Sequence, residues 1–348
     1  MTLSAREQHR AHPPRWDIRS LEVSDRDQET KMKRREAFAT LMVLIVTSCL
    51  HVAAQIPVPV HGVTVEDTHD IATQSFQTKV ITALSNLSVK ATTRLVYTPG
   101  NAACYYQAAT NDIHAVSYIM GQPVDSSEMK CFTPAQYMSR FQDYVTTLGS
   151  VVDMWEVGNE INGDWLYGST KGCQPKATVG STSQADVMTK MTQAYEYVKA
   201  QGGVTELTLY EYPDLNSNCV SNGSTHDMIP WVQANVPSDM KQGLDYVLVS
   251  YYNDSCPGSQ PEPNWNSVFQ QLAAIFPNAR LGFGEVGWSK KSNDTTSYIT
   301  NLVDHFYELS VTAPNYVGGY FYWEFSLDMV PDTKPLWAVI NTALQNEP

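Results

Sequence analysis

Two glutamates of this sequence stand where a mostly apolar stretch runs out. Residues 151–157 lead into Gly158-Asn159-Glu160, and residues 280–288, which read RLGFGEVGW, place Glu285 in the same way. Such a run is typical of a strand buried on both faces, so each carboxyl group would be delivered at a strand end. Two carboxyl groups placed like this can act as a general acid/base and a nucleophile. The expected chemistry is group transfer through a covalent intermediate, without a metal or other cofactor.

The two segments resemble those of a known group of enzymes. Gly158-Asn159-Glu160 and Gly284-Glu285-Val286-Gly287-Trp288 are similar to the acid/base and nucleophile segments of the clan GH-A retaining glycoside hydrolases. The resemblance implies a (β/α)8 barrel with the glutamates at the ends of its fourth and seventh strands. It also implies that Glu160 protonates the glycosidic oxygen and then activates water, while Glu285 forms a glycosyl-enzyme ester.

Four further residues acquire roles from the same resemblance. Asn159 would hydrogen-bond the 2-hydroxyl of the sugar, and Arg94 would hold the nucleophile ionised and oriented. Tyr252 would donate a hydrogen bond to the nucleophile, although strand alternation lets only one of Tyr251 and Tyr252 face the barrel axis. Trp323 would form the floor of the subsite at the scissile bond. The plainer alternatives are a turn for Asn159, a surface salt bridge for Arg94 and barrel core for Trp323.

The sequence also departs from the pattern of the clan. The histidines that many members carry after strand three and before the strand-six tyrosine have no match, because His114 stands at the start of its expected strand and Ser250 occupies the other position. Glu156 and Glu324 lie beside the motifs and are expected to support the site or the structure. The exact family within the clan therefore stays open.

Strands must alternate with helices if these residues are to meet at one end of a barrel. The expected strands are Val58–Glu66, Thr92–Tyr97, His114–Met120, Val151–Val157, Leu207–Tyr210, Tyr246–Tyr252, Arg280–Glu285 and Gly318–Phe325. The expected helices are Asp70–Leu84, a short piece with Tyr105 and Tyr106, one capped by Thr133, then Ser183–Ala200, Met228–Ala234, Trp265–Phe276, Thr295–Leu309 and Leu336–Leu344. This alternation predicts a single α/β domain, a (β/α)8 (TIM) barrel, with its longest loops after strands three, four and five on the active-site face.

Aromatic residues in and near these loops suggest a groove for a sugar polymer. Trp165 and Trp288 are the main candidates for stacking on pyranose rings, and plain packing is the alternative for each. The same two readings apply to Tyr167, Tyr212 and Trp231.

The amino terminus reads as a leader. Residues 1–31 are polar and charged, which suggests an over-extended gene start or a cytosolic tail, and residues 32–54 combine a basic start, an apolar centre and a small-residue end at Val52-Ala53-Ala54. The pattern is that of a signal peptide, with a type II membrane anchor as the alternative. Residues 55–348 would form the secreted catalytic domain, and the expected sites for N-glycans are Asn86, Asn222, Asn253 and Asn293.

The charge balance and the cysteines indicate which partners and which disulfides to expect. The chain carries 23 basic and 36 acidic residues, which excludes nucleic acid as an expected partner. Outside the leader stand Cys104, Cys131, Cys173, Cys219 and Cys256, all expected in loops that follow strands. A Cys104–Cys131 bridge is predicted, and Cys219 is expected to pair with Cys173 or Cys256.

The sequence therefore predicts a secreted, monomeric, retaining β-glycosidase that is endo-acting on a cell-wall β-glycan. A transglycosylase on the same glycans and a catalytically silent carbohydrate-binding barrel are the alternatives. Linkage and sugar specificity stay open.

Overall fold

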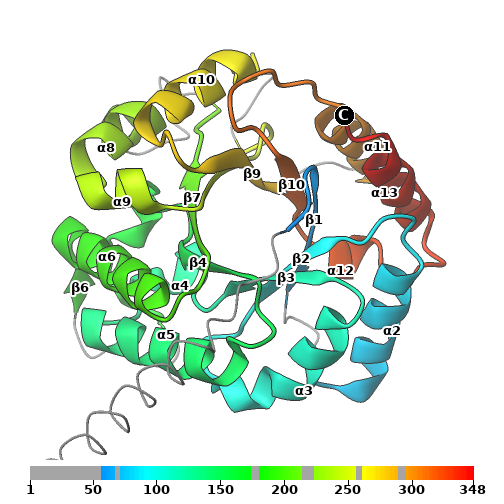
Figure 1. Cartoon of the computed structure of the whole chain (residues 1–348), viewed down its shortest axis with the longest axis horizontal. Helices are drawn as coiled ribbons and strands as arrows, with labels where there is room; N and C mark the ends of the chain where they lie inside the picture. Colours follow the sequence, from blue (N-terminus) through cyan, green and yellow to red (C-terminus); the bar gives the residue numbers. More distant parts are fainter. Residues whose placement is uncertain (1–55, 67–70, 174–179, 214–222, 256–260, 289–294) are drawn as a thin grey trace, which may run out of the picture. The chain divides into compact units, whose positions relative to one another are not determined.

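Eight parallel strands close into a barrel in which β1 pairs with both β2 and β10 (Figure 1). The computed structural model describes residues 56–66, 71–173, 180–213, 223–255, 261–288 and 295–348, all within one compact unit. The barrel strands are β1 (Val60–Glu66), β2 (Thr92–Val96), β3 (Tyr118–Gln122), β4 (Met154–Gly158), β7 (Thr205–Tyr210), β8 (Tyr246–Tyr251), β9 (Arg280–Val286) and β10 (Gly318–Tyr322). This arrangement confirms the expected single (β/α)8 barrel.

Helices connect the strands, and the longer ones lie on the outside of the ring, as Figure 1 shows. They are α2 (Gln74–Ser85), α3 (Ala103–His114), α4 (Ser126–Met129), α5 (Pro134–Leu148), α6 (Gln184–Ala200), α7 (Gly223–His226), α8 (Met228–Asn235), α9 (Ser238–Gly243), α10 (Trp265–Ile275), α11 (Thr295–Tyr307), α12 (Phe325–Asp328) and α13 (Pro335–Asn346). The turn η2 (Asp164–Leu166) and a small antiparallel pair, β5 (Gly168–Ser169) and β6 (Ser181–Thr182), lie between β4 and α6.

The helix that precedes β4 begins as the sequence predicts. Thr133 accepts a hydrogen bond from the Gln136 amide at 3.2 Å, and the Gln136 side chain accepts one from the Thr133 amide at 2.9 Å. This capping box, with Pro134 at the first helical position, satisfies amides that would otherwise lack a partner.

The strands have apolar side chains on both faces. One cluster fills the interior of the barrel, and a larger one lies between strands and helices. The interior cluster consists of Ile56, Val60, Met120, Met154, Tyr246, Leu248, Val317 and Phe321. A polar layer, which includes Arg94, Glu156 and Glu206, shares the interior of the barrel with this cluster.

Two local predictions are wrong. Strand three was expected from His114, but His114 is the last residue of α3 and the strand begins at Tyr118. Cys104 was expected in a loop and lies instead in the first turn of α3. The helical piece around Tyr105 therefore extends over twelve residues, and it occupies most of the chain between β2 and β3.

Residues 1–54, which were predicted to form a leader, lie outside the described residues, as do Asn222 and Asn293. Asn86 and Asn253 are exposed. Among the described residues, no helix combines the length and the apolar character needed to cross a membrane.

Candidate active site

Glu160 follows β4 in a backbone conformation that side chains seldom adopt. Its φ is +48°, in the left-handed region, and the ladder between β4 and β7 slips by one residue between Glu156 and Gly158. The Ile161 amide donates to the carbonyl oxygen of Thr208 at 3.1 Å, which holds the turn against β7. Such a conformation costs about 1–3 kcal/mol and persists where neighbouring contacts enforce it. The strand end is therefore shaped to present Glu160.

Glu285 lies within β9, next to a second irregularity in the ladder. Val249 pairs with Phe283 and Ser250 pairs with Glu285, so Gly284 is an extra residue on β9. A Cβ atom on Gly284 would stand 2.9 Å from Cβ of Leu248, too close for a side chain. Glycine is therefore required where the strand bends to bring Glu285 to the site.

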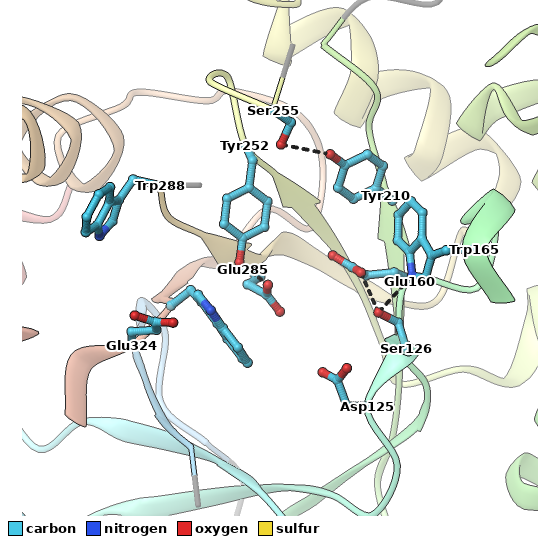
Figure 2. A pocket seen from close by; sticks show the side chains of 11 residues that line it. Asp125, Ser126, Glu160, Trp165, Tyr210, Tyr252, Ser255, Glu285, Trp288 and Glu324 are labelled. Carbon is cyan, nitrogen blue, oxygen red and sulfur yellow. Dashed lines mark hydrogen bonds between the residues drawn. The ribbon is translucent and has the colours of Figure 1, made fainter. Parts of the chain in front are cut away.

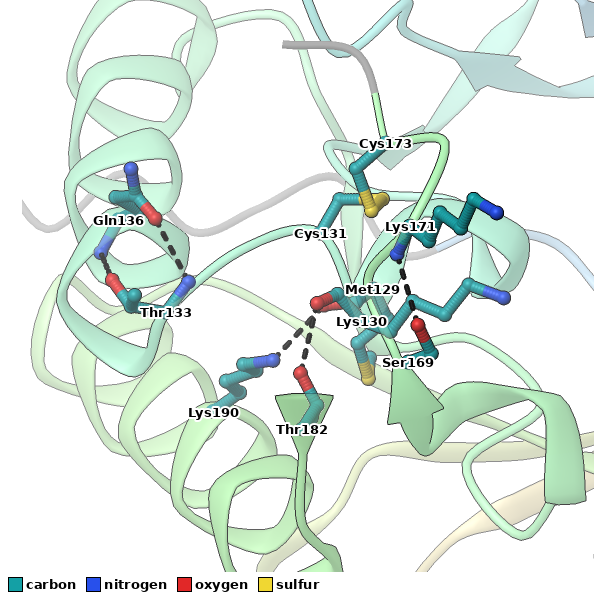
Figure 3. The surroundings of a disulfide bond; sticks show 10 residues. All are labelled: Met129, Lys130, Cys131, Thr133, Gln136, Ser169, Lys171, Cys173, Thr182 and Lys190. Carbon is teal, nitrogen blue, oxygen red and sulfur yellow. Dashed lines mark hydrogen bonds between the residues drawn. A yellow bond between two sulfur atoms is a disulfide. The ribbon is translucent and has the colours of Figure 1, made fainter. Parts of the chain in front are cut away.

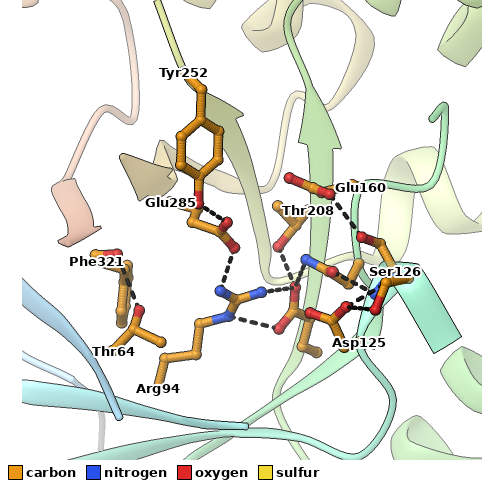
Figure 4. Close-up of polar contacts among 12 residues, drawn as sticks. Thr64, Arg94, Asp125, Ser126, Glu160, Thr208, Tyr252, Glu285 and Phe321 are labelled. Atoms are coloured by element: carbon orange, nitrogen blue, oxygen red, sulfur yellow. Dashed lines mark hydrogen bonds and ion pairs between the residues drawn. The ribbon is translucent and has the colours of Figure 1, made fainter. Parts of the chain in front are cut away.

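Arg94 connects β2 to both β4 and β9 and is fully buried. Its Nε donates to Glu156 Oε2 at 3.0 Å and its Nη2 donates to Glu156 Oε1 at 3.1 Å, while Nη1 donates to Glu285 Oε2 (Figure 4). A buried guanidinium needs such partners, and two carboxylates share its charge here. Arg94 thus has one carboxylate partner in β4, Glu156, and another that lines the cavity, Glu285.

Tyr252 follows β8 and donates its hydroxyl hydrogen to Glu285 Oε1 (Figure 4). Tyr251 packs instead against Trp265, with ring centroids 4.9 Å apart. Burial raises the pKa of the Glu285 carboxyl, and the Arg94 guanidinium and the Tyr252 hydroxyl oppose that shift. Both contacts stabilise the ionised form of Glu285.

Glu160 has a different environment. Burial raises its pKa well above the ordinary range, and the nearby negative charge of Glu285 adds to that shift. Ser126 Oγ donates to Glu160 Oε2 at 2.7 Å, and Trp165 Nε1 donates to Ser126 Oγ at 3.1 Å. Because Trp165 Nε1 is a donor only, the hydroxyl hydrogen of Ser126 is left for Glu160. No ion pair reaches the Glu160 carboxyl from a described residue, so the acid form is favoured.

Both carboxyl groups line a cavity of about 410 Å³ (Figure 2). The other lining residues are Asp125, Ser126, Trp165, Tyr210, Tyr252, Ser255, Trp288, Trp323 and Glu324. A second cavity of about 360 Å³ shares Asp125 and Trp323 with the first. Together they provide two adjoining hollows beside the paired glutamates.

Some of the aromatic residues expected to stack on sugar rings line the cavity, and at least one lies in the core instead. Trp165, Trp288 and Trp323 line the larger cavity, and the Arg94 guanidinium lies 5.8 Å from the Trp323 ring centroid. Trp231 is 3% exposed and belongs to the hydrophobic core, so it packs.

Asn159 lies beside the cavity without lining it. Its Oδ1 accepts from the Ser126 amide at 2.7 Å, and its Nδ2 donates to Glu156 Oε1 at 2.8 Å. The side chain therefore joins α4 to the Arg94–Glu156 pair. One Nδ2 hydrogen is left for a further acceptor.

Sequence reasoning missed Asp125, Ser126 and Tyr210. Asp125 caps α4, where its Oδ1 accepts from the Ser127 amide at 2.8 Å, and Ser126 starts that helix. A helix of four residues has no periodicity to detect, and the Asp-Ser-Ser capping pattern was the only local signal. Tyr210 ends β7, and its ring meets that of Trp165 edge to face at 5.0 Å.

The predicted disulfide is wrong. Cys131 is bonded to Cys173 (Figure 3). Cys104 is free and exposed. The expected Cys219–Cys173 alternative is excluded with it, while Cys219 and Cys256 lie outside the described residues. The bond joins the segment after α4 to the loop after β4, and Lys190 Nζ adds a hydrogen bond to the Met129 carbonyl at 2.9 Å. The two loops that supply Ser126 and Glu160 are therefore tied together.

In the part of the chain that the structure describes, no group of three or more His, Cys, Asp or Glu side chains is placed to hold a metal ion. The site's polar groups are instead carboxyl, hydroxyl, amide and indole groups.

No family model and no curated protein matches this chain. Among solved structures, a family 1 β-glucosidase from Thermotoga maritima is similar, with a TM-score of 0.53, 10% identity and coverage of 80% of this chain and 87% of its own. A β-glucosidase from Thermotoga maritima in complex with deoxynojirimycin has a TM-score of 0.52 and 11% identity, and the match covers 80% of this chain and 87% of that one. Saccharomyces cerevisiae Gas2p in complex with laminaritriose and laminaritetraose has a TM-score of 0.49 and 13% identity. The match covers 83% of this chain and 64% of the length of that one. The likeness to clan GH-A enzymes is confirmed at the level of the barrel fold.

Proposed function

We propose that this protein is a retaining β-glycoside hydrolase, with Glu285 as the nucleophile and Glu160 as the acid/base. One observation carries the proposal: Glu160 and Glu285 are both buried and line the same cavity, but only Glu285 is paired with a guanidinium. Two carboxyl groups in environments that separate their pKa values are what an acid and a nucleophile require.

In the first step, the ionised Glu285 oxygen attacks the anomeric carbon while Glu160 gives its proton to the departing glycosidic oxygen. The bond to the leaving sugar breaks as the ester to Glu285 forms. In the second step, Glu160 takes a proton from water, and the resulting attack releases the sugar and restores Glu285. The loss of negative charge from Glu285 in the first step lowers the pKa of Glu160, which suits it to act as a base in the second.

The substrate class follows from the lining of the two cavities. Trp165, Trp288 and Trp323 offer faces for sugar rings, and the carboxylates of Asp125 and Glu324 offer acceptors for hydroxyl groups. No Lys, Arg or His is among the described residues that line either cavity, which disfavours a polyanionic glycan. We infer a neutral β-linked oligo- or polysaccharide, cleaved within the chain, as in a cell-wall glycan.

The rest of the proposal concerns the whole chain. Residues 32–54 direct secretion, residues 55–348 form the catalytic domain, and the enzyme acts as a monomer. Asn159 would make its proposed contact with the sugar 2-hydroxyl through the remaining Nδ2 hydrogen.

The test begins with a panel of linkage-defined β-glycans and activated aryl glycosides. Glu285→Ala should lower hydrolysis by several orders of magnitude, and azide should restore turnover with a glycosyl azide of inverted configuration. Glu160→Ala should spare the glycosylation step on aryl glycosides with good leaving groups, and azide should give a product of retained configuration. Glu324→Ala is the matched control, because it lines the same cavity and should give no azide product.

Each outcome separates the alternatives. Exchanged configurations would mean that the two roles are reversed. Products longer than the substrate would identify a transglycosylase. Near wild-type behaviour of both Glu285→Ala and Glu160→Ala would leave a carbohydrate-binding barrel.

A further inference from the structure

A third carboxyl group, that of Glu206, lies inside the barrel next to the Arg94 network. Glu206 is in β7, has no exposed surface, and pairs in register with Glu156 of β4 and Tyr246 of β8. It does not line either cavity, so it cannot reach a substrate. The mechanism proposed above gives it no part.

The charges around Glu206 do not balance if every carboxyl group is ionised. Glu156 of β4 and Glu285 of β9 already use the Nε, Nη1 and Nη2 donors of Arg94. Tyr246, on the other neighbouring strand, contributes a hydroxyl that accepts from Arg280 at 3.0 Å. Among the described residues, Arg94 is therefore the one cation that pairs with a carboxyl group of this set, and it pairs with Glu156 and Glu285 but not with Glu206.

The hydrogen bonds of Thr208 show which carboxyl group holds a proton. Thr208 Oγ1 lies 2.7 Å from Glu156 Oε1 and 2.9 Å from Glu206 Oε1, but its hydroxyl has one hydrogen. One of the two carboxyl groups must therefore donate to Thr208. Glu156 Oε1 already accepts from Arg94 and Asn159, so its oxygens are occupied as a carboxylate. Glu206 Oε2 has no partner among the described residues, which would be costly for an ionised group.

We propose that Glu206 is a neutral carboxylic acid in the folded protein and that it positions the nucleophile through Thr208, Glu156 and Arg94. The Glu206 hydroxyl donates to Thr208, and the Thr208 hydroxyl donates to Glu156. Glu156 then stays ionised and satisfied, so that Arg94 keeps one Nη donor directed at Glu285. Glu206 is thus a positioning residue beneath the catalytic pair.

The electrostatic environment agrees with this assignment. Burial raises the pKa of Glu206 well above its ordinary range, and the neighbouring charge of Glu156 raises it further. The Thr208 hydroxyl, the Arg94 charge and the Leu248 amide oppose the shift without cancelling it.

The role in catalysis rests on the proposed function, but the protonation of Glu206 can be tested without a substrate. A folded state that binds one proton more than the unfolded state becomes less stable as the pH rises. Its folding constant falls about tenfold per pH unit between the ordinary pKa of the group and its raised pKa in the folded state. Glu206→Gln removes that proton while keeping a donor for Thr208. The ratio of its folding constant to that of the wild type should therefore rise about tenfold per pH unit from pH 5.5 to 7.5, measured by urea unfolding.

Glu196→Gln is the matched control, because Glu196 is exposed on α6 and its ratio should stay flat. A flat ratio for Glu206→Gln would overturn the proposal, since an ionised Glu206 binds no extra proton. Failure of Glu206→Gln to fold at pH 5.5 would also overturn it, because the amide reproduces the shape and the donor of the neutral acid.

The positioning role is tested by the acidic limb of the kcat/KM profile, which reports the ionisation of free Glu285. Glu206→Leu removes the donor that directs the Thr208 hydroxyl at Glu156. A Glu156 carboxylate without that hydrogen bond should draw Arg94 away from Glu285, so the limb should move upward by about one pH unit. Glu206→Gln should return the limb to its wild-type position. Equal profiles for Glu206→Leu and wild type would refute the positioning role. Absence of activity on every glycan would refute the proposed function and leave the unfolding result to decide the protonation.

Discussion

Tyr252→Phe provides the sharpest test of how Glu285 is kept ionised. The substitution removes one hydroxyl, which donates to Glu285 Oε1, and leaves the ring in place. The hydrogen bond stabilises the carboxylate and not the acid, so it lowers the pKa of Glu285. Its loss should therefore raise that pKa.

The size of the effect follows from the partners. A hydrogen bond to a charged group contributes about 1.5–3 kcal/mol, and about 1.4 kcal/mol corresponds to one pKa unit. Arg94 still holds the other oxygen of Glu285, which keeps the shift at the lower end. The acidic limb of kcat/KM should move upward by about one pH unit, and activity below the limb should fall about tenfold.

The adjacent tyrosine is a matched control. Tyr251 Oη is buried without a hydrogen-bond partner among the described residues, and its ring packs on Trp265 outside the barrel. Tyr251→Phe should leave the limb unmoved and leave the free energy of unfolding equal or slightly higher. The pH profiles of both variants would be measured on the best aryl glycoside found. An unmoved limb in Tyr252→Phe, or equal shifts in both variants, would refute the reasoning.

Two further predictions concern the neighbourhood of Glu160. Ser126→Ala removes a hydrogen-bond donor to the Glu160 carboxylate, so the pKa of Glu160 should rise. The alkaline limb of kcat/KM should then move upward by about one pH unit, and Ser127→Ala is the control that should leave it unshifted. Replacing Cys131 and Cys173 by serine opens a link between residues 42 positions apart and should lower the free energy of unfolding by about 4 kcal/mol, whereas Cys104→Ser should change it little; equal urea midpoints for the two changes would contradict the assigned pairing.

The barrel could be predicted because each strand carries its own signal. Strands buried on both faces read as apolar runs, and a single Arg94 within such a run has to find a carboxylate inside the barrel. The glycines around Glu285 point in the same direction, since a strand interior tolerates glycine mainly at a bulge or a close approach. These features are local, so sequence alone was sufficient for them.

Other features depend on which loops become neighbours. Cys104 was assigned to a loop, but it lies in the first turn of α3 and is free, and Cys131 is bonded to Cys173. The choice between Tyr251 and Tyr252 depended on register at a strand end, where a one-residue slip exchanges the two faces. Ser126 had no periodic signal at all, because its role arises only when α4 meets the turn at Glu160.

The division between acid and nucleophile arises from backbone irregularities at the ends of two strands. A regular ladder would place alternate side chains of each strand at fixed heights inside the barrel. Glu156 stands before the slip in β4 and pairs with Arg94, and Glu160 follows the slip, while the extra Gly284 in β9 precedes Glu285, which also pairs with the guanidinium. One cation is thereby given to Glu156 and Glu285 and withheld from Glu160, which keeps the proton that the first step of the reaction consumes.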